Sequence, residues 1–78
     1  MTNDGLPVVS GKLAVRALEN AGFYIERTIG SHYVLVHRSD ASRAVTVPVH
    51  GNRDLKKGTL RAIIRQAGMT VDEFIDLL

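Results

Sequence analysis

Apolar residues recur at intervals of three and four positions near the start of the chain, which places them on one face of an amphipathic helix. The residues that share this face are Leu13, Ala14, Ala17, Leu18 and Ala21. Ser10 stands before them, where a serine hydroxyl accepts a free backbone N–H of the first turn. Gly22 follows them, and glycine is the usual residue in the left-handed position that closes a helix. The pattern therefore predicts a helix between Ser10 and Gly22.

The pattern then changes to alternation, which is typical of β-strands. In the strand 23–29, one buried face is expected to hold Phe23, Ile25 and Ile29, and the other face Tyr24, Glu26 and Thr28. A turn at Gly30-Ser31 leads into a second strand, 33–36, which is apolar on both faces. After a polar connection at 39–42, a third strand begins at Arg43 and ends at Pro48. Short connections between successive strands predict an antiparallel meander.

The last third of the chain returns to helical spacing. The apolar residues at this spacing are Leu60, Ile63, Ile64 and Ala67. They predict a helix over residues 59–67, which Gly68 ends. Thr70 and Glu73 have the spacing of a capping box, in which each side chain satisfies a backbone N–H of the other residue. This motif predicts a short final helix that buries Phe74.

Together these elements predict one α+β domain over residues 1–78, with residues 1–9 as a flexible lead-in. The architecture is two-layered: a three-stranded antiparallel sheet carries the helices on one face, in the order α-β-β-β-α plus a short C-terminal helix. The other face of the sheet stays open. We expect Tyr24, Val34 and Val36 on this open face, as a surface for a protein partner. The alternative is that the faces of the strands are assigned the wrong way round.

Composition narrows the setting in which the domain works. The chain has no cysteine, no apolar run of the roughly 18 residues that cross a membrane, and no signal-peptide pattern, so we expect a cytoplasmic protein without a membrane role. The formal charge is only +2, but residues 27–65 carry eight lysines and arginines against two aspartates, a net charge of +6. Residues 70–78 carry a net charge of −3. The basic segment 27–65 favours a polyanionic partner. The alternative is a solvated surface that happens to be basic.

The histidines do not predict a metal site or another cofactor. His32 and His37 are five residues apart on one strand, so their side chains point to opposite faces. No acidic residue falls at a spacing that would complete a set of ligands with them. Ser31 is adjacent to His32 in an extended segment, where neighbouring side chains diverge, so a serine–histidine nucleophile is not favoured. A phosphate-binding glycine loop is also absent from the sequence.

RNA cleavage needs fewer protein groups, because RNA carries its own nucleophile, the 2′-hydroxyl. Such an enzyme needs a base, an acid and cations near the phosphate, and histidine serves either proton-transfer role near neutral pH. We expect folding to bring Gly30-Ser31-His32 beside the helix start at Lys56-Lys57, so that cations and helix N–H groups face the phosphate. Arg61 would widen the contact with RNA. The alternative is that His32 is an ordinary half-exposed strand residue.

Two motifs that occur in this order resemble the HicA toxin family of bacterial toxin–antitoxin systems. The first is Gly30-Ser31-His32 before an apolar strand. The second is Leu55-Lys56-Lys57-Gly58-Thr59-Leu60-Arg61, which follows Pro48 and His50, and the likeness runs from about Ser10 to Gly68. The resemblance implies a fold like that of double-stranded-RNA-binding domains, metal-independent cleavage of mRNA in a stress response, and a HicB-like antitoxin that covers the active histidine.

The resemblance also assigns roles to residues. The catalytic histidine of the family matches His32, and its glycine and helix-start lysine match Gly30 and Lys57. Many members have a second histidine directly after the first, where this chain has Tyr33, which we expect to pack rather than react. Residues 69–78 run past the usual end of the family.

Three functions from different classes remain open at this point. The first is a toxin that is an endoribonuclease, the second a non-catalytic double-stranded-RNA-binding module, and the third a protein-interaction domain that uses the open face of the sheet. The first two share a fold, so the fold does not separate them. His50, in the loop after Pro48, is within reach of a phosphate, but a structural role is favoured for it and for His37.

Overall fold

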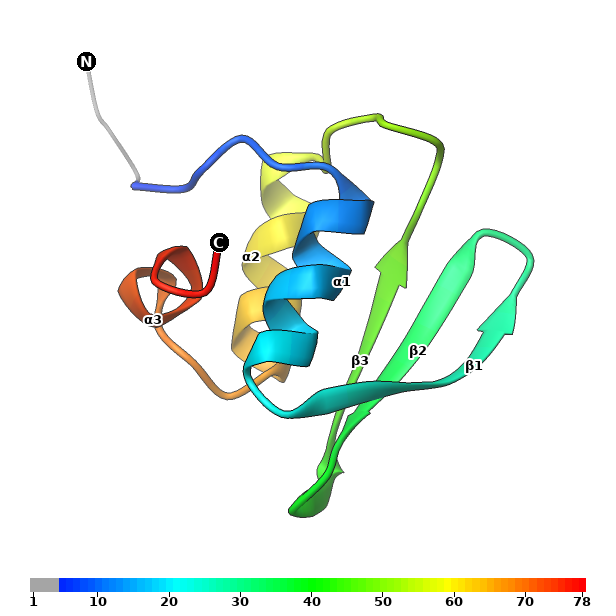
Figure 1. The fold of residues 1–78 in the computed structure, drawn as a ribbon. Coiled ribbons are helices and arrows are strands. Elements are labelled where there is room, and N and C mark those ends of the chain that lie inside the picture. The colour runs from blue at the N-terminus through cyan, green and yellow to red at the C-terminus, as the bar shows by residue number, and fades with distance from the viewer. Residues whose placement is uncertain (1–4) are drawn as a thin grey trace.

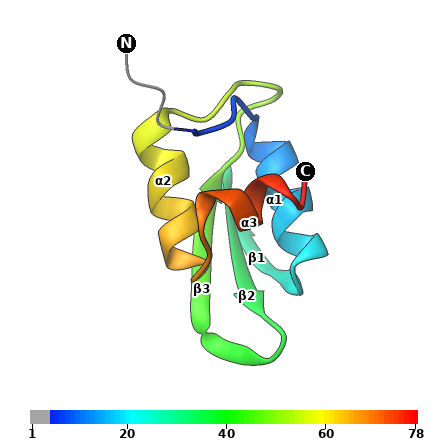
Figure 2. The ribbon, with the colours of Figure 1, turned by 90° about the vertical axis from the view of Figure 1, so that its left-hand side faces the viewer.

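The computed structural model describes residues 5–78. It consists of a three-stranded antiparallel sheet, in the order β1-β2-β3, with the helices on one face (Figure 1). Seen at a right angle to that view, the helices stand in front of the sheet (Figure 2), which confirms the predicted two-layer α+β fold. The elements are α1 (Gly11–Asn20), β1 (Phe23–Ile29), β2 (His32–His37), β3 (Asp40–Pro48), α2 (Lys57–Gln66) and α3 (Val71–Ile75).

The core forms where the apolar faces of the helices meet the inner face of the sheet. Leu18 of α1 and Leu60 of α2 are at most 1% exposed. From the sheet, β2 contributes Leu35, and β3 contributes Val45 and Val47. Burial of these side chains removes apolar surface from water, which is the main force that holds so small a domain together.

The predicted caps of the first and last helices, α1 and α3, are confirmed. The Ser10 hydroxyl accepts the Leu13 N–H at 3.2 Å and caps α1. Gly22 closes that helix at a φ of 101°, a backbone conformation that residues with a side chain rarely adopt. At the start of α3, Thr70 and Glu73 form the capping box: the hydroxyl accepts the Glu73 N–H and the carboxylate accepts the Thr70 N–H.

The predicted burial of β1 is wrong beyond Phe23. The register of β1 against β2 shifts between Ile25 and Arg27, so Glu26 forms a β-bulge. A bulge inserts one residue, and the following side chains therefore exchange faces. Ile29 consequently lies on the open face with its side chain 58% exposed, and Ile25 is 38% exposed.

Several element boundaries also differ from the sequence prediction, and β2 is one residue longer at each end than the expected 33–36. β3 begins at Asp40 instead of Arg43, because the chain turns already at residues 38–39. The Ser42 hydroxyl donates a hydrogen bond to Asp40 at 2.6 Å, and this bond holds the pKa of the Asp40 carboxyl below its ordinary value. The α2 helix begins at Lys57, two residues before the predicted start.

The segment before α1 is joined to the loop before α2. The Leu55 N–H donates to the Val9 carbonyl at 2.8 Å, and Ser10 forms an isolated bridge with Asp54. Val9 is buried and belongs to the core, although we expected residues 1–9 to be a flexible lead-in. Residues 1–4 of that expected lead-in lie outside the described part of the chain.

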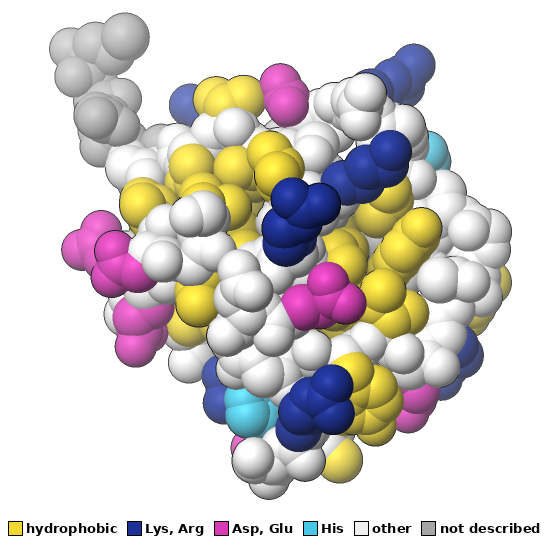
Figure 3. Space-filling model, in the orientation of Figure 1, with side chains coloured by type: hydrophobic (Ala, Val, Ile, Leu, Met, Phe, Trp, Pro, Cys, Tyr) yellow, Lys and Arg dark blue, Asp and Glu magenta, His cyan; other side chains and the backbone are white. Residues whose placement is uncertain are grey.

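The C-terminal helix adds to the core instead of lying over the basic surface. Phe74 is fully buried, and Leu77 packs partly buried against the core. The three acidic residues of this segment, Asp72, Glu73 and Asp76, are exposed. Figure 3 shows acidic side chains gathered over α3, while an apolar patch lies between α1 and the C-terminal residues.

A glycine allows α1 to begin directly against β3. A Cβ on Gly11 would collide with the Pro48 carbonyl oxygen, which belongs to the backbone and moves only with the strand. We therefore expect Gly11→Ala to destabilise the fold by about 1–3 kcal/mol, as overpacking does elsewhere. Thermal unfolding checks this, with Gly58→Ala as the control, because nothing lies within 4 Å of a Cβ there. Equal melting temperatures for the two variants would contradict the close approach of Gly11 to the Pro48 carbonyl.

Candidate active site

His32 lies at the very start of β2, directly after the turn from β1. Its backbone partners across the sheet are Ile29 on β1 and Pro48 on β3. Side chains alternate along a strand, and Leu35 points into the core, so His32 lies on the open face. Its side chain is exposed, and within residues 5–78 its ring has no hydrogen-bonding partner.

The turn before His32 is a two-residue hairpin connection between paired residues Ile29 and His32. Gly30 has a φ of 57°, as glycine has at the first turn position of a type II′ hairpin. A Cβ at Gly30 would meet nothing within 4 Å, so the backbone conformation explains the glycine. The Ser31 carbonyl accepts the Val49 N–H at 2.7 Å, which joins this turn to the segment after β3.

The start of α2 is electropositive. Its N-cap is Lys56, whose side chain makes no capping hydrogen bond, and the first turn contains no acidic residue. Lys56 and Lys57 are both exposed, and Arg61 is exposed one turn further along the helix. The positive end of the helix dipole lies at the same place as the two lysines, so this end attracts anions.

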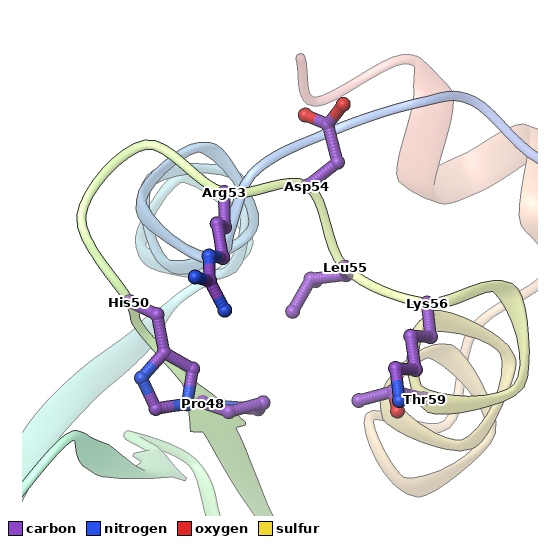
Figure 4. A pocket seen from close by; sticks show the side chains of 7 residues that line it. All are labelled: Pro48, His50, Arg53, Asp54, Leu55, Lys56 and Thr59. Carbon is purple, nitrogen blue, oxygen red and sulfur yellow. The ribbon is translucent and has the colours of Figure 1, made fainter.

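The loop between β3 and α2 surrounds a shallow cavity of about 260 Å³. Figure 4 shows His50, Arg53 and Lys56 around this hollow, while the Asp54 carboxylate points away from it. The cavity therefore presents cations, a histidine ring and a hydroxyl to whatever enters it. Its lining residues are Pro48, His50, Arg53, Asp54, Leu55, Lys56 and Thr59.

Pro48 connects the two stretches that we expected to meet. It is the cross-strand partner of His32, and it lines the cavity together with Lys56. The structure thus places the histidine one strand away from the basic loop. Among the other residues predicted to bind RNA, Gly30 and Ser31 form the adjoining turn, and Lys57 and Arg61 follow on α2. Their roles stay predictions.

The three residues predicted for a protein partner share the open face with His32. Tyr24 is paired with Val36 across the strands, and Val34 with Thr46. Tyr24 is 38% exposed and Val34 is half-buried, but Val36 is only 7% exposed. The Arg38 guanidinium lies 5.6 Å from the centre of the Tyr24 ring. In the free chain, only Tyr24 and Val34 of this set therefore offer accessible surface.

His37 has a structural environment. Its ring packs edge-on against Phe23, with 5.0 Å between the ring centres. Nε2 donates to the Ala21 carbonyl at 3.1 Å, and Nδ1 accepts the Ser39 N–H at 3.1 Å. Because a carbonyl only accepts and an N–H only donates, these bonds require the neutral ring with its proton on Nε2. Tyr33 is half-buried against the core, in accord with the packing role expected for it.

Sequence reasoning missed the other members of the cavity. Arg53 and Thr59 received no role, and His50 received a structural one. A signal was present, since the loop that joins the two motifs carries a histidine and an arginine within four residues.

Within residues 5–78, no three histidine, cysteine, aspartate or glutamate side chains gather in a group that could hold a metal ion. No described helix has the length and apolar character to cross a membrane.

Comparison with known proteins connects this geometry to a family. No curated protein matched the chain in a search for similar sequences. The family model described as HicA toxin of bacterial toxin-antitoxin matches residues 11–69. The match begins at the first residue of α1 and ends before α3, so it includes the hairpin turn, His32, the cavity and α2. Because the matched region is more than half of the sequence, the chain belongs to the HicA toxin family of bacterial toxin–antitoxin systems.

Proposed function

We propose that this toxin is an endoribonuclease that cleaves mRNA without a metal ion, with His32 as its catalytic residue. The observation that carries the proposal is the position of His32: exposed on the open face and paired with Pro48, which lines the basic cavity. Membership in a family of toxins supports it. The alternative is a non-catalytic double-stranded-RNA-binding module with the same fold. Cleavage of RNA by the purified chain and by its His32→Ala variant separates the two.

In this proposal the reaction uses the 2′-hydroxyl of the RNA as the nucleophile. The 2′-oxygen attacks the adjacent phosphorus, and the bond from phosphorus to the 5′-oxygen breaks. His32 acts as the base or the acid in these proton transfers. Lys56 and Lys57 at the α2 start stabilise the charge that grows on the phosphate oxygens. The turn Gly30-Ser31 shapes the approach of the RNA to His32.

The lysines should contribute to RNA affinity in a way that salt reveals. We expect Lys56→Gln/Lys57→Gln to weaken binding to single-stranded RNA and to reduce the slope of log affinity against log salt by about 1.4, because each phosphate that a lysine neutralises adds about 0.7 to that slope. Fluorescence anisotropy at several salt concentrations measures this slope. The matched control is Lys12→Gln/Arg16→Gln, which removes two exposed charges from α1. An equal reduction of the slope in the control would show that binding depends only on net charge.

The partner of the toxin is proposed to be a HicB-like antitoxin that covers His32. Tyr24 and Val34 lie on the same open face as His32 and would extend the contact. Expression of the chain alone should arrest growth, and co-expression of a HicB-like antitoxin should relieve that arrest. Arrest that co-expression leaves unchanged would count against it.

A further inference from the structure

His50, in the loop after β3, has no structural contact within residues 5–78 that explains it. His50 is exposed and lines the cavity with Arg53, Lys56 and Thr59 (Figure 4). Within the described part of the chain its ring has no hydrogen-bonding partner, whereas both ring nitrogens of His37 are engaged. A ring without a protein partner is available to exchange protons with a ligand.

His50 also lies close to His32. Paired residues in an antiparallel sheet have Cα atoms about 5 Å apart, and His32 is paired with Pro48, two residues before His50. The bond from the Val49 N–H to the Ser31 carbonyl holds the intervening segment against the hairpin turn. Two residues span at most about 7 Å, so the Cα atoms of the two histidines are at most about 12 Å apart.

We infer that His50 is the second acid–base group of the cleavage, an inference that rests on the proposed function. One imidazole takes the proton of the 2′-hydroxyl as the 2′-oxygen forms its bond to phosphorus. The other, protonated, gives its proton to the 5′-oxygen as the bond from phosphorus to that oxygen breaks. The products are a 2′,3′-cyclic phosphate and a 5′-hydroxyl, so atoms and charges balance. Arg53 and Lys56, which face the same cavity, hold the phosphate between the two rings.

A sulfur-substituted substrate tests this assignment. A short RNA in which sulfur replaces the 5′-bridging oxygen at one site needs no acid, because a thiolate leaves unprotonated. On the ordinary RNA, His50→Gln should cleave about 10²-fold more slowly than the wild type. On the sulfur-substituted RNA, one of the two variants His50→Gln and His32→Ala should recover a rate close to that of the wild type, and the other should not. The variant that recovers is the one that lacks the acid.

The controls separate this inference from the proposed function. Asn52→Ala, an exposed loop variant, should cleave like the wild type, and thermal unfolding should show His50→Gln to be folded. If His50→Gln cleaves at the wild-type rate while His32→Ala does not, the inference is overturned and the proposed function stands. If His50→Gln is slow but neither variant recovers on the sulfur substrate, His50 is not the second proton-transfer group. If the wild type does not cleave RNA, both fail.

Discussion

Replacement of His32 by alanine should lower the rate of RNA cleavage by roughly 10²-fold or more. The expectation follows from the role proposed for the imidazole, because a positioned acid–base group contributes about 10²–10⁴-fold to a rate. The alanine side chain leaves the turn and the backbone pairing of residue 32 in place. Initial rates on a long single-stranded RNA in excess EDTA, wild type beside variant, measure the effect.

The variant should lose activity without losing its fold. His32 is exposed, and substitution of an exposed residue usually changes the free energy of unfolding by about 0.5 kcal/mol or less. Thr46→Ala is the matched control, since Thr46 is exposed on the same face of the sheet and should tolerate the change. A His32→Ala variant that is fully active and fully toxic would show the assignment to be wrong. If neither protein cleaves RNA but both bind it in a salt-sensitive way, the RNA-binding module is favoured. If neither protein binds RNA even at low salt, the protein-interaction domain is favoured.

Phe74→Ala should lower the free energy of unfolding by about 3–5 kcal/mol, which is typical for loss of a buried phenylalanine. Phe74 is fully buried in α3, a helix that lies beyond the matched region of the family. So large a loss would remove a large share of the stability of a domain of this size, because small domains are only marginally stable. Urea unfolding monitored by circular dichroism gives the difference directly.

The neighbouring residue provides the comparison for Phe74. Ile75 belongs to the same helix but is 39% exposed, so Ile75→Ala should cost about 1 kcal/mol. A destabilisation by Phe74→Ala no larger than that by Ile75→Ala would mean that α3 is only loosely attached. In that case the part of the chain after residue 69 would be an appendage to the domain and not a part of its core.

The elements were predictable because their signals are local. The spacing of Leu60 and Ile63 defines a helix by itself, and the Ser10 cap and the Thr70 capping box depend on residues only three positions apart. The bulge at Glu26 has a weaker signal: Arg27 interrupts the apolar alternation between Ile25 and Ile29, but a single polar residue does not by itself define a bulge. Only pairing with β2 shows that the strand gains one residue, and this pairing decides which face Ile29 occupies.

The site was predictable only in part, for a similar reason. Two motifs and their order were enough to expect His32 near Lys56, and the pairing of His32 with Pro48 provides the physical link. The cavity itself depends on how the loop 49–56 folds back between β3 and α2. A loop conformation depends on contacts at its two ends, such as the bond from Leu55 to Val9, which no local pattern specifies. His50 and Arg53 were therefore missed as a group.

The ends of the RNA fragments test the central claim most directly. The measurement is digestion by the wild-type protein, in excess EDTA, of an RNA and of a 2′-deoxy version of the same sequence. The account predicts that only the RNA is cut, and that its fragments carry a 5′-hydroxyl and a 2′,3′-cyclic phosphate. Cleavage of the deoxy version, or fragments with a 5′-phosphate, would contradict a reaction in which the 2′-hydroxyl attacks beside His32.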